Sequence, residues 1–115
     1  MLKSLFSVIN KIKNNYDIFK KIVHLRKIKP KGILSLQKHH HRSEHWLVTE
    51  GTPKITLNKD RFSKKQNDHI FIPLEAIHRI ENPGNKPVKI IEAQVGSILK
   101  ETDIIRYQDV YGRIK

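Results

Sequence analysis

The chain has 115 residues, no cysteine and a formal net charge of +12, with 23 lysines and arginines against 11 acidic residues. This length fits a single domain. The absence of cysteine excludes disulfides and thiolate metal sites, so only histidine, carboxylate or amide side chains could hold a metal. The high charge favours a nucleic-acid or anionic-membrane partner, and the position of the charge decides whether that interpretation holds.

Most of the positive charge lies near the N-terminus. Residues 1–31 contain nine basic residues and one acid, a net +8, whereas the remaining residues carry a net +4. Eight of these nine basic residues are lysine, and only Phe6, Tyr16 and Phe19 offer rings for stacking. A solvated charged segment is therefore a better interpretation than a nucleic-acid-binding arm, and we expect no nucleic-acid partner.

We interpret residues 1–20 as a basic extension, either a short helix or disordered. Its apolar residues recur at helical spacing: Leu2, Leu5, Phe6, Ile9 and Ile12. Such a helix could pack on the domain or rest on a membrane surface, and packing or disorder is the default. No charge-free apolar stretch approaches the ~18–20 residues of a membrane span, and no secretory signal is evident. We expect a cytoplasmic protein without a transmembrane segment.

From about residue 21 to 115, short β-rich runs separated by turns predict an all-β barrel domain. The predicted strands are residues 22–29, 33–41, 45–49, 54–57, 61–63, 69–72, 78–81 and 88–95. Short strands with Gly/Pro punctuation are typical of an antiparallel barrel or jelly roll. Residues 100–115 are expected to form a strand or a helical turn that closes one end. We assign to the core Trp46, Phe71 and the isoleucines at positions 70, 72, 90 and 91.

Four of the seven histidines lie within seven residues: His39, His40, His41 and His45. Alternate side chains of a strand share a face, so Gln37, His39 and His41 are expected to point the same way. Glu44 follows beyond a predicted bend, and His78 lies on a later predicted strand. Gln37, His39, Glu44 and His78 could thus converge inside a small barrel on a metal ion. The alternative is a surface patch of histidines that binds no metal.

These spacings resemble the two motifs of cupin barrels. The first motif is matched by Gly32 near its start, Gln37-Lys38-His39, Glu44 and Gly51. The second is matched by the run from Pro73 to Asn82, PLEAIHRIEN, which contains His78. Two positions depart from the pattern, because Gln37 replaces the first histidine and Glu75 replaces a glycine. We expect the second departure to matter less, since Glu75 lies in a turn.

Longer runs resemble the C-terminal cupin of type II phosphomannose isomerases, which are often fused to mannose-1-phosphate guanylyltransferase. These runs are LSLQKHHHRSEHW, FIPLEAIHRIENPGNKPVKIIEAQVGS and DIIRYQDVYGR. The similarity covers roughly residues 21–113, and glutamine at the first ligand position is usual in phosphomannose isomerases. The resemblance implies a double-stranded β-helix, metal ligands Gln37, His39, Glu44 and His78, and interconversion of mannose 6-phosphate and fructose 6-phosphate.

The implied chemistry assigns further roles. The cofactor is one divalent metal, with zinc the default and cobalt, manganese, nickel or iron also fitting such ligands. We expect Arg42 near the barrel mouth, binding phosphate or an oxyanion, or else in a surface ion pair. His41 and His45 are candidates for the catalytic base, unless they are structural. Arg106 and Arg113 are further candidates for phosphate binding, whereas His24, His40 and His69 are expected to be incidental.

No nucleotide-binding loop is found, because the five glycines are too scattered to cradle a phosphate. We therefore expect isomerase activity without guanylyltransferase activity, on a small phosphorylated sugar. The alternative is a non-catalytic or differently specific sugar-binding metal cupin, left over from a split bifunctional enzyme. A homodimer formed through sheet edges or exchanged end strands is expected, since a small barrel has edges to cover.

Overall fold

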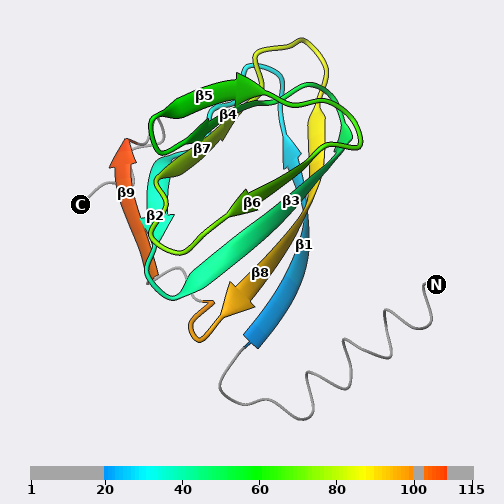
Figure 1. Cartoon of the computed structure of the whole chain (residues 1–115). Helices are drawn as coiled ribbons and strands as arrows, with labels where there is room; N and C mark the ends of the chain where they lie inside the picture. Colours follow the sequence, from blue (N-terminus) through cyan, green and yellow to red (C-terminus); the bar gives the residue numbers. More distant parts are fainter. Residues whose placement is uncertain (1–19, 100–102, 109–115) are drawn as a thin grey trace, which may run out of the picture.

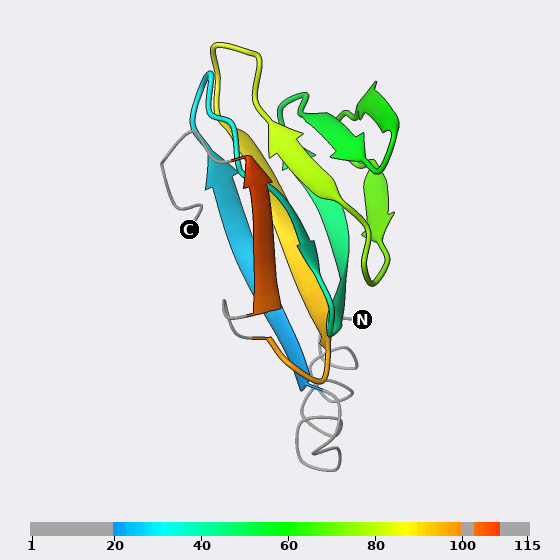
Figure 2. The same cartoon turned by 90° about the vertical axis from the view of Figure 1, so that its left-hand side faces the viewer.

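The computed structural model describes residues 20–99 and 103–108, which form nine strands in two antiparallel sheets. The four-stranded sheet has the order β1 (Lys20–Ile28), β8 (Val88–Gly96), β3 (Arg42–Glu50) and β6 (His69–Ile72). The five-stranded sheet has the order β5 (Asp60–Ser63), β4 (Lys54–Leu57), β7 (His78–Glu81), β2 (Leu36–His39) and β9 (Ile104–Gln108). Figures 1 and 2 show the sheets as two facing layers. The prediction of an all-β antiparallel barrel or jelly-roll domain is confirmed.

Each predicted strand is present, but the first histidine-rich one is shorter than expected. It was predicted over residues 33–41 and covers only Leu36–His39. Ile33 forms only an isolated bridge with Glu81, and a bend at His40 and His41 ends the strand. The carboxylate of Asp103 holds this bend by accepting hydrogen bonds from the backbone N–H of His40 at 3.3 Å and of His41 at 2.9 Å. After the bend β3 begins at once, at Arg42. The expected closing strand is β9, directly after Asp103.

Glu75 lies in the turn between β6 and β7, with a φ of 68°. This left-handed region favours glycine, which explains why the cupin motif usually has glycine at this position. The backbone N–H of Glu75 donates to the carbonyl of His39 at 2.9 Å. The turn thus holds the end of β2 beside the start of β7.

The apolar core fills the space between the two sheets. It consists of Ile28, Trp46, Val48, Ile55, Ile70, Ile72, Ala76, Ile80, Val88 and Ile90. The prediction of a buried position is confirmed for Trp46, Ile70, Ile72 and Ile90. It is wrong for Phe71 and Ile91, which are 46% and 38% exposed. Side chains alternate along a strand, so these two residues face outward when their neighbours face the core.

The outward side of the four-stranded sheet carries a group of exposed apolar side chains, here called the outer apolar face: Val23, Leu25, Leu47, Phe71 and Ile91. In the strand register, Leu25 of β1 lies opposite Ile91 of β8, which lies opposite Leu47 of β3. These side chains therefore form a continuous row across neighbouring strands. Residues 20–99 and 103–108 contain no helix that could span a bilayer.

Candidate metal centre

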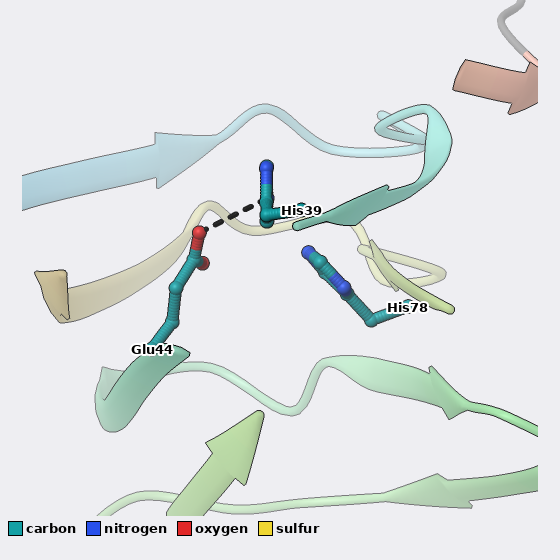
Figure 3. Close-up of side chains that lie close together, drawn as sticks. All are labelled: His39, Glu44 and His78. Atoms are coloured by element: carbon teal, nitrogen blue, oxygen red, sulfur yellow. Dashed lines mark ion pairs between the residues drawn. The ribbon is translucent and has the colours of Figure 1, made fainter. Parts of the chain in front are cut away.

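His39, Glu44 and His78 converge between the two sheets (Figure 3). His39 ends β2, Glu44 lies on β3 just past the bend, and His78 begins β7. One candidate ligand atom from each residue lies within 4.8 Å of the others, and all three side chains are buried. Polar groups removed from water in this way are costly unless they bind a partner. The structure therefore brings together three of the four predicted ligands as a group that could hold a metal.

Every oxygen of the Glu44 carboxylate is engaged. Its Oε2 lies 3.1 Å from Nε2 of His39, the contact drawn in Figure 3, and accepts a hydrogen bond from Nε of Arg42 at 3.0 Å. Its Oε1 accepts a hydrogen bond from the indole N–H of Trp46 at 2.9 Å. From the sequence we expected Trp46 to be a core residue, without a contact to Glu44. Alternation along β3 is the signal that could have revealed it, since Arg42, Glu44 and Trp46 share a face.

Two imidazole nitrogens in the cluster are buried and contact no hydrogen-bond partner within the described residues. They are Nδ1 of His39 and Nε2 of His78. The other nitrogen of His78, Nδ1, lies 2.9 Å from the carbonyl oxygen of Ala76. A carbonyl oxygen only accepts, so Nδ1 carries the proton and Nε2 presents a lone pair. A buried polar atom without a partner costs about 1–3 kcal/mol, which a bound metal would offset. The donors therefore fit a divalent metal.

The protonation states of the cluster also suit metal binding. Burial raises the pKa of Glu44, but the hydrogen bond with His39 and the neighbouring charges outweigh it and lower this pKa to about 2. Burial lowers the pKa of His78 below its usual value. Near neutral pH the cluster thus presents a carboxylate and a neutral imidazole. These are the forms that bind metals.

Gln37, the fourth predicted ligand, lies on β2 directly opposite His78 in the strand register. It lines the same pocket as Glu44 and His78. Its side-chain carbonyl accepts a hydrogen bond from the hydroxyl of Ser35 at 2.8 Å. The structure thus places Gln37 beside the cluster, and its role as a metal ligand remains a prediction.

Two members of the cluster, Glu44 and His78, line a pocket of about 150 Å³ between the sheets. Four arginines are among the described residues that line it: Arg26, Arg42, Arg79 and Arg106. The Nε of Arg106, on β9, is buried and contacts no hydrogen-bond partner in the described part of the chain. The guanidinium of Arg79 instead donates to the carbonyl of Leu34 at 2.9 Å and to Gln108 at 3.1 Å. Of these arginines, Arg42 and Arg106 were expected from the sequence, whereas Arg26 and Arg79 were not.

Arg42 lies deeper than predicted. We expected it near the barrel mouth or in a surface ion pair, but it is only 5% exposed. Besides its bond to Glu44, its Nη2 lies 3.3 Å from Nε2 of His39. Arg42 is buried because it shares the inward face of β3 with Glu44. Its positive charge therefore lies beside the candidate ligands themselves.

The structure does not bring the two predicted bases to this pocket. His41 lies at the bend, where its Nδ1 is 2.7 Å from Oδ1 of Asp103 and its side chain is half exposed. His45 faces outward from β3, with its Nδ1 3.1 Å from Nε2 of His69. Neither residue lines the pocket, since alternation turns His45 away from Glu44. Arg113, the remaining candidate for phosphate binding, lies outside the described residues.

A family model described as "Mannose-6-phosphate isomerase C-terminal" matches residues 6–109. The chain belongs to this family. The predicted resemblance is thereby confirmed. The match begins earlier than residue 21, where we expected the similarity to begin. The boundary between an extension and a barrel domain at residue 20 remains a prediction.

Curated relatives are similar over 86 residues, which is 75% of this chain and 18% of each relative. They include the alginate biosynthesis protein AlgA of Pseudomonas aeruginosa at 50% identity and the xanthan biosynthesis protein XanB of Xanthomonas campestris at 48%. A mannose-1-phosphate guanylyltransferase of Escherichia coli is 49% identical. The matched segment is thus less than one fifth of the length of these relatives.

Solved structures support the fold. The cupin domain of Cnp3 from Schizosaccharomyces pombe has a TM-score of 0.64 at 14% identity, covering 66% of this chain and 56% of that one. A double-stranded β-helix protein from Klebsiella pneumoniae has a TM-score of 0.65 at 17% identity, covering 77% and 76%. At these identities the similarity concerns the fold alone, which is the predicted double-stranded β-helix.

Proposed function

We propose that the pocket catalyses the metal-dependent interconversion of mannose 6-phosphate and fructose 6-phosphate. The observation that carries this proposal is the buried group of His39, Glu44 and His78 in an arginine-lined pocket. This group occurs in a chain that belongs to the family described as "Mannose-6-phosphate isomerase C-terminal". His39, Glu44 and His78, with Gln37, would hold one divalent metal. Zinc is the default, and cobalt, manganese, nickel or iron would also fit.

Aldose–ketose isomerisation moves a proton between C2 and C1 of the open-chain sugar through an enediolate. The reaction needs positive charge near the sugar oxygens, a base near the carbons and an anchor for the phosphate. A bound divalent metal would supply Lewis-acid chemistry at the sugar oxygens. Arg42 adds a buried positive charge beside Glu44 and His39. Such preorganised charge stabilises a developing oxyanion because water does not screen it.

Arg106 is our proposed phosphate ligand. It lines the pocket, and its buried Nε contacts no partner within the described residues. A guanidinium matches the oxygens of a phosphate through paired hydrogen bonds. A phosphorylated sugar would therefore provide the partner that this Nε lacks. Binding of phosphate by Arg113 remains a prediction from the sequence.

We propose isomerisation without guanylyltransferase activity for this chain, since its glycines are too scattered for a nucleotide loop. The relatives named for alginate and xanthan biosynthesis favour a role in polysaccharide biosynthesis. A cytoplasmic location remains a prediction from the sequence. The alternative function, a sugar-binding cupin without catalysis, is an outcome of the test below.

We also propose a homodimer, in which a second copy of the chain covers the outer apolar face. The row formed by Leu25, Ile91 and Leu47 runs across neighbouring strands. An exposed apolar face of a sheet can pack against its own symmetry copy as two sheets pack face to face. This differs from the predicted contact through sheet edges or exchanged strands.

The test is a coupled assay for fructose 6-phosphate formed from mannose 6-phosphate. We expect turnover by metal-loaded protein, its loss after chelation and its return on adding metal. His78→Ala should lower kcat/KM at least about 100-fold, because a bound metal contributes several kcal/mol of transition-state stabilisation and each 1.4 kcal/mol is about tenfold in rate. His69→Ala should resemble the wild type because His69 does not line the pocket. A folded, metal-loaded protein that binds mannose 6-phosphate without turnover would contradict the proposal and support the sugar-binding alternative.

A further inference from the structure

A second carboxylate lines the pocket besides Glu44. Glu92 lies on β8, directly opposite Trp46 of β3 in the strand register, and is only 7% exposed. It takes no part in the group of His39, Glu44 and His78. Buried carboxylates are uncommon unless paired or functional. Glu92 is paired with Arg26 at 3.5 Å, but this arginine is itself half exposed and engages only one of the two carboxylate oxygens.

The two oxygens of Glu92 have different surroundings. Its Oε1 accepts hydrogen bonds from Nε2 of Gln94 at 2.5 Å and from Nη2 of Arg26 at 3.5 Å. No residue in the described part of the chain donates a hydrogen bond to Oε2. One oxygen thus fixes the orientation of the carboxylate, and the other is available to a ligand in the pocket.

The other titratable groups near the pocket are less suited to accept a proton from a sugar. Both oxygens of Glu44 are already engaged, one by Arg42 and His39 and the other by the indole N–H of Trp46. The imidazoles of His41 and His45 lie outside the pocket lining. Glu92 combines a place in the lining, a fixed orientation and an oxygen without a described partner. A candidate base needs this geometry first.

We propose that Glu92 is the catalytic base of the isomerisation, an inference that rests on the proposed function. Oε2 of Glu92 takes the proton from C2 of open-chain mannose 6-phosphate. The electrons of the broken C2–H bond form a C1=C2 double bond, and those of the C1 carbonyl move to O1, giving an enediolate. Glu92 then returns the proton to C1, and the O2 proton moves to O1 as the C2 carbonyl forms. The product is fructose 6-phosphate, and Glu92 is again a carboxylate.

Glu92→Gln tests this role because glutamine keeps the size and the hydrogen-bonding capacity but cannot accept the proton. We expect kcat to fall about 10²–10⁴-fold, the usual contribution of a general base, with KM changed less than about threefold and metal content unchanged. The matched control is Glu50→Gln, since Glu50 is exposed on the same sheet beside Lys89. This control should keep the wild-type kcat.

Hydrogen exchange provides a second measurement. In deuterated water the wild type should introduce deuterium at C2 of mannose 6-phosphate, and Glu92→Gln should lose this exchange while still binding the sugar. If Glu92→Gln does not fold, Glu92→Asp is the deciding variant, because a shorter carboxylate should lower kcat at unchanged metal content. A wild-type kcat in the folded variant, or a raised KM alone, would overturn the inference. An inactive metal-loaded wild type would instead overturn the proposed function.

Discussion

Glu44 contacts both another candidate ligand and the residues that surround the candidate metal site. Its carboxylate contacts His39, Arg42 and Trp46. Burial raises the pKa of Glu44, but the hydrogen bond with His39 and the neighbouring charges outweigh it and keep the carboxylate ionised. In metal sites, hydrogen bonds of this kind orient the ligands and are needed for full affinity. Glu44 is thus both a candidate ligand and the residue through which Arg42 and Trp46 orient the site.

Titration of the cluster should make the metal-free protein less stable in acid. Burial lowers the pKa of His78 from its usual 6.5, so the unfolded chain binds this proton before the folded chain does. Stability is therefore present above pH 6.5 and falls as the pH drops below it. Each unit of pKa difference corresponds to about 1.4 kcal/mol. The lowered pKa of Glu44 adds a further loss between its usual 4.5 and about 2.

Urea unfolding of the metal-free protein between pH 7.5 and 5 measures this effect. We expect the free energy of unfolding to fall with pH in the wild type, and less steeply in His78→Gln, which has no imidazole to protonate. Parallel curves for the two proteins would show that His78 does not contribute.

The sequence could predict which residues converge but not the role of every neighbour. The spacing of His39, Glu44 and His78, together with the resemblance to the cupin motifs, predicted that these residues lie close together, as they do. The outward position of His45 could also be predicted, because His45 directly follows the inward-facing Glu44 and side chains alternate along a strand. His41 could not be placed in this way, because the bend after His39 interrupts the alternation. That bend is held by Asp103, 62 residues further along the chain, and no local pattern reveals such a contact.

At the scale of elements, the join between β2 and β3 depends on Gly96 at the end of β8. Gly96 pairs with Arg42 in the strand register. A Cβ added at Gly96 would overlap the carbonyl oxygen of His41 and lie 2.6 Å from Cα of Arg42. The close approach of these backbones therefore requires glycine, and it sets the position of Arg42 in the pocket.

Gly96→Ala should consequently destabilise the protein by at least about 2 kcal/mol, since a clash with backbone cannot be relieved by a side-chain rotation. Thermal unfolding checks this expectation. The matched control is Gly84→Ala, where the nearest atom to the added Cβ would be Oδ1 of Asn82 at 3.4 Å. Equal unfolding temperatures for the two variants would contradict the packing described for Gly96.

At the scale of the whole molecule, short alternating runs with Gly/Pro turns were enough to predict an antiparallel all-β barrel or jelly roll. The assignment of Phe71 and Ile91 to the core failed for a definite reason. Sequence alone shows that these residues are apolar, but both faces of their strands carry apolar residues, so hydrophobicity does not reveal which face is buried. The structure places them on the outer apolar face, where a protein partner can cover them.

The proposed homodimer leads to a prediction for this face. Leu25 is 73% exposed at its edge, and Leu25→Glu should shift the protein from dimer to monomer because a charge would be buried in the contact. Sedimentation of wild type and variant, compared with twice the 13.5 kDa chain mass, measures this. Leu74→Glu, exposed in the turn after β6, should remain dimeric. A monomeric wild type, or a dimeric Leu25→Glu, would contradict the proposal.

The metal content per chain tests the buried cluster most directly. We predict one divalent ion per chain in the metal-loaded wild type and in His69→Ala, whose histidine lies outside the pocket. Gln37→Ala and His78→Ala should each lose most of the bound metal, because each removes one proposed ligand while the protein stays folded. Full metal occupancy in both folded variants would contradict the proposed ligand set.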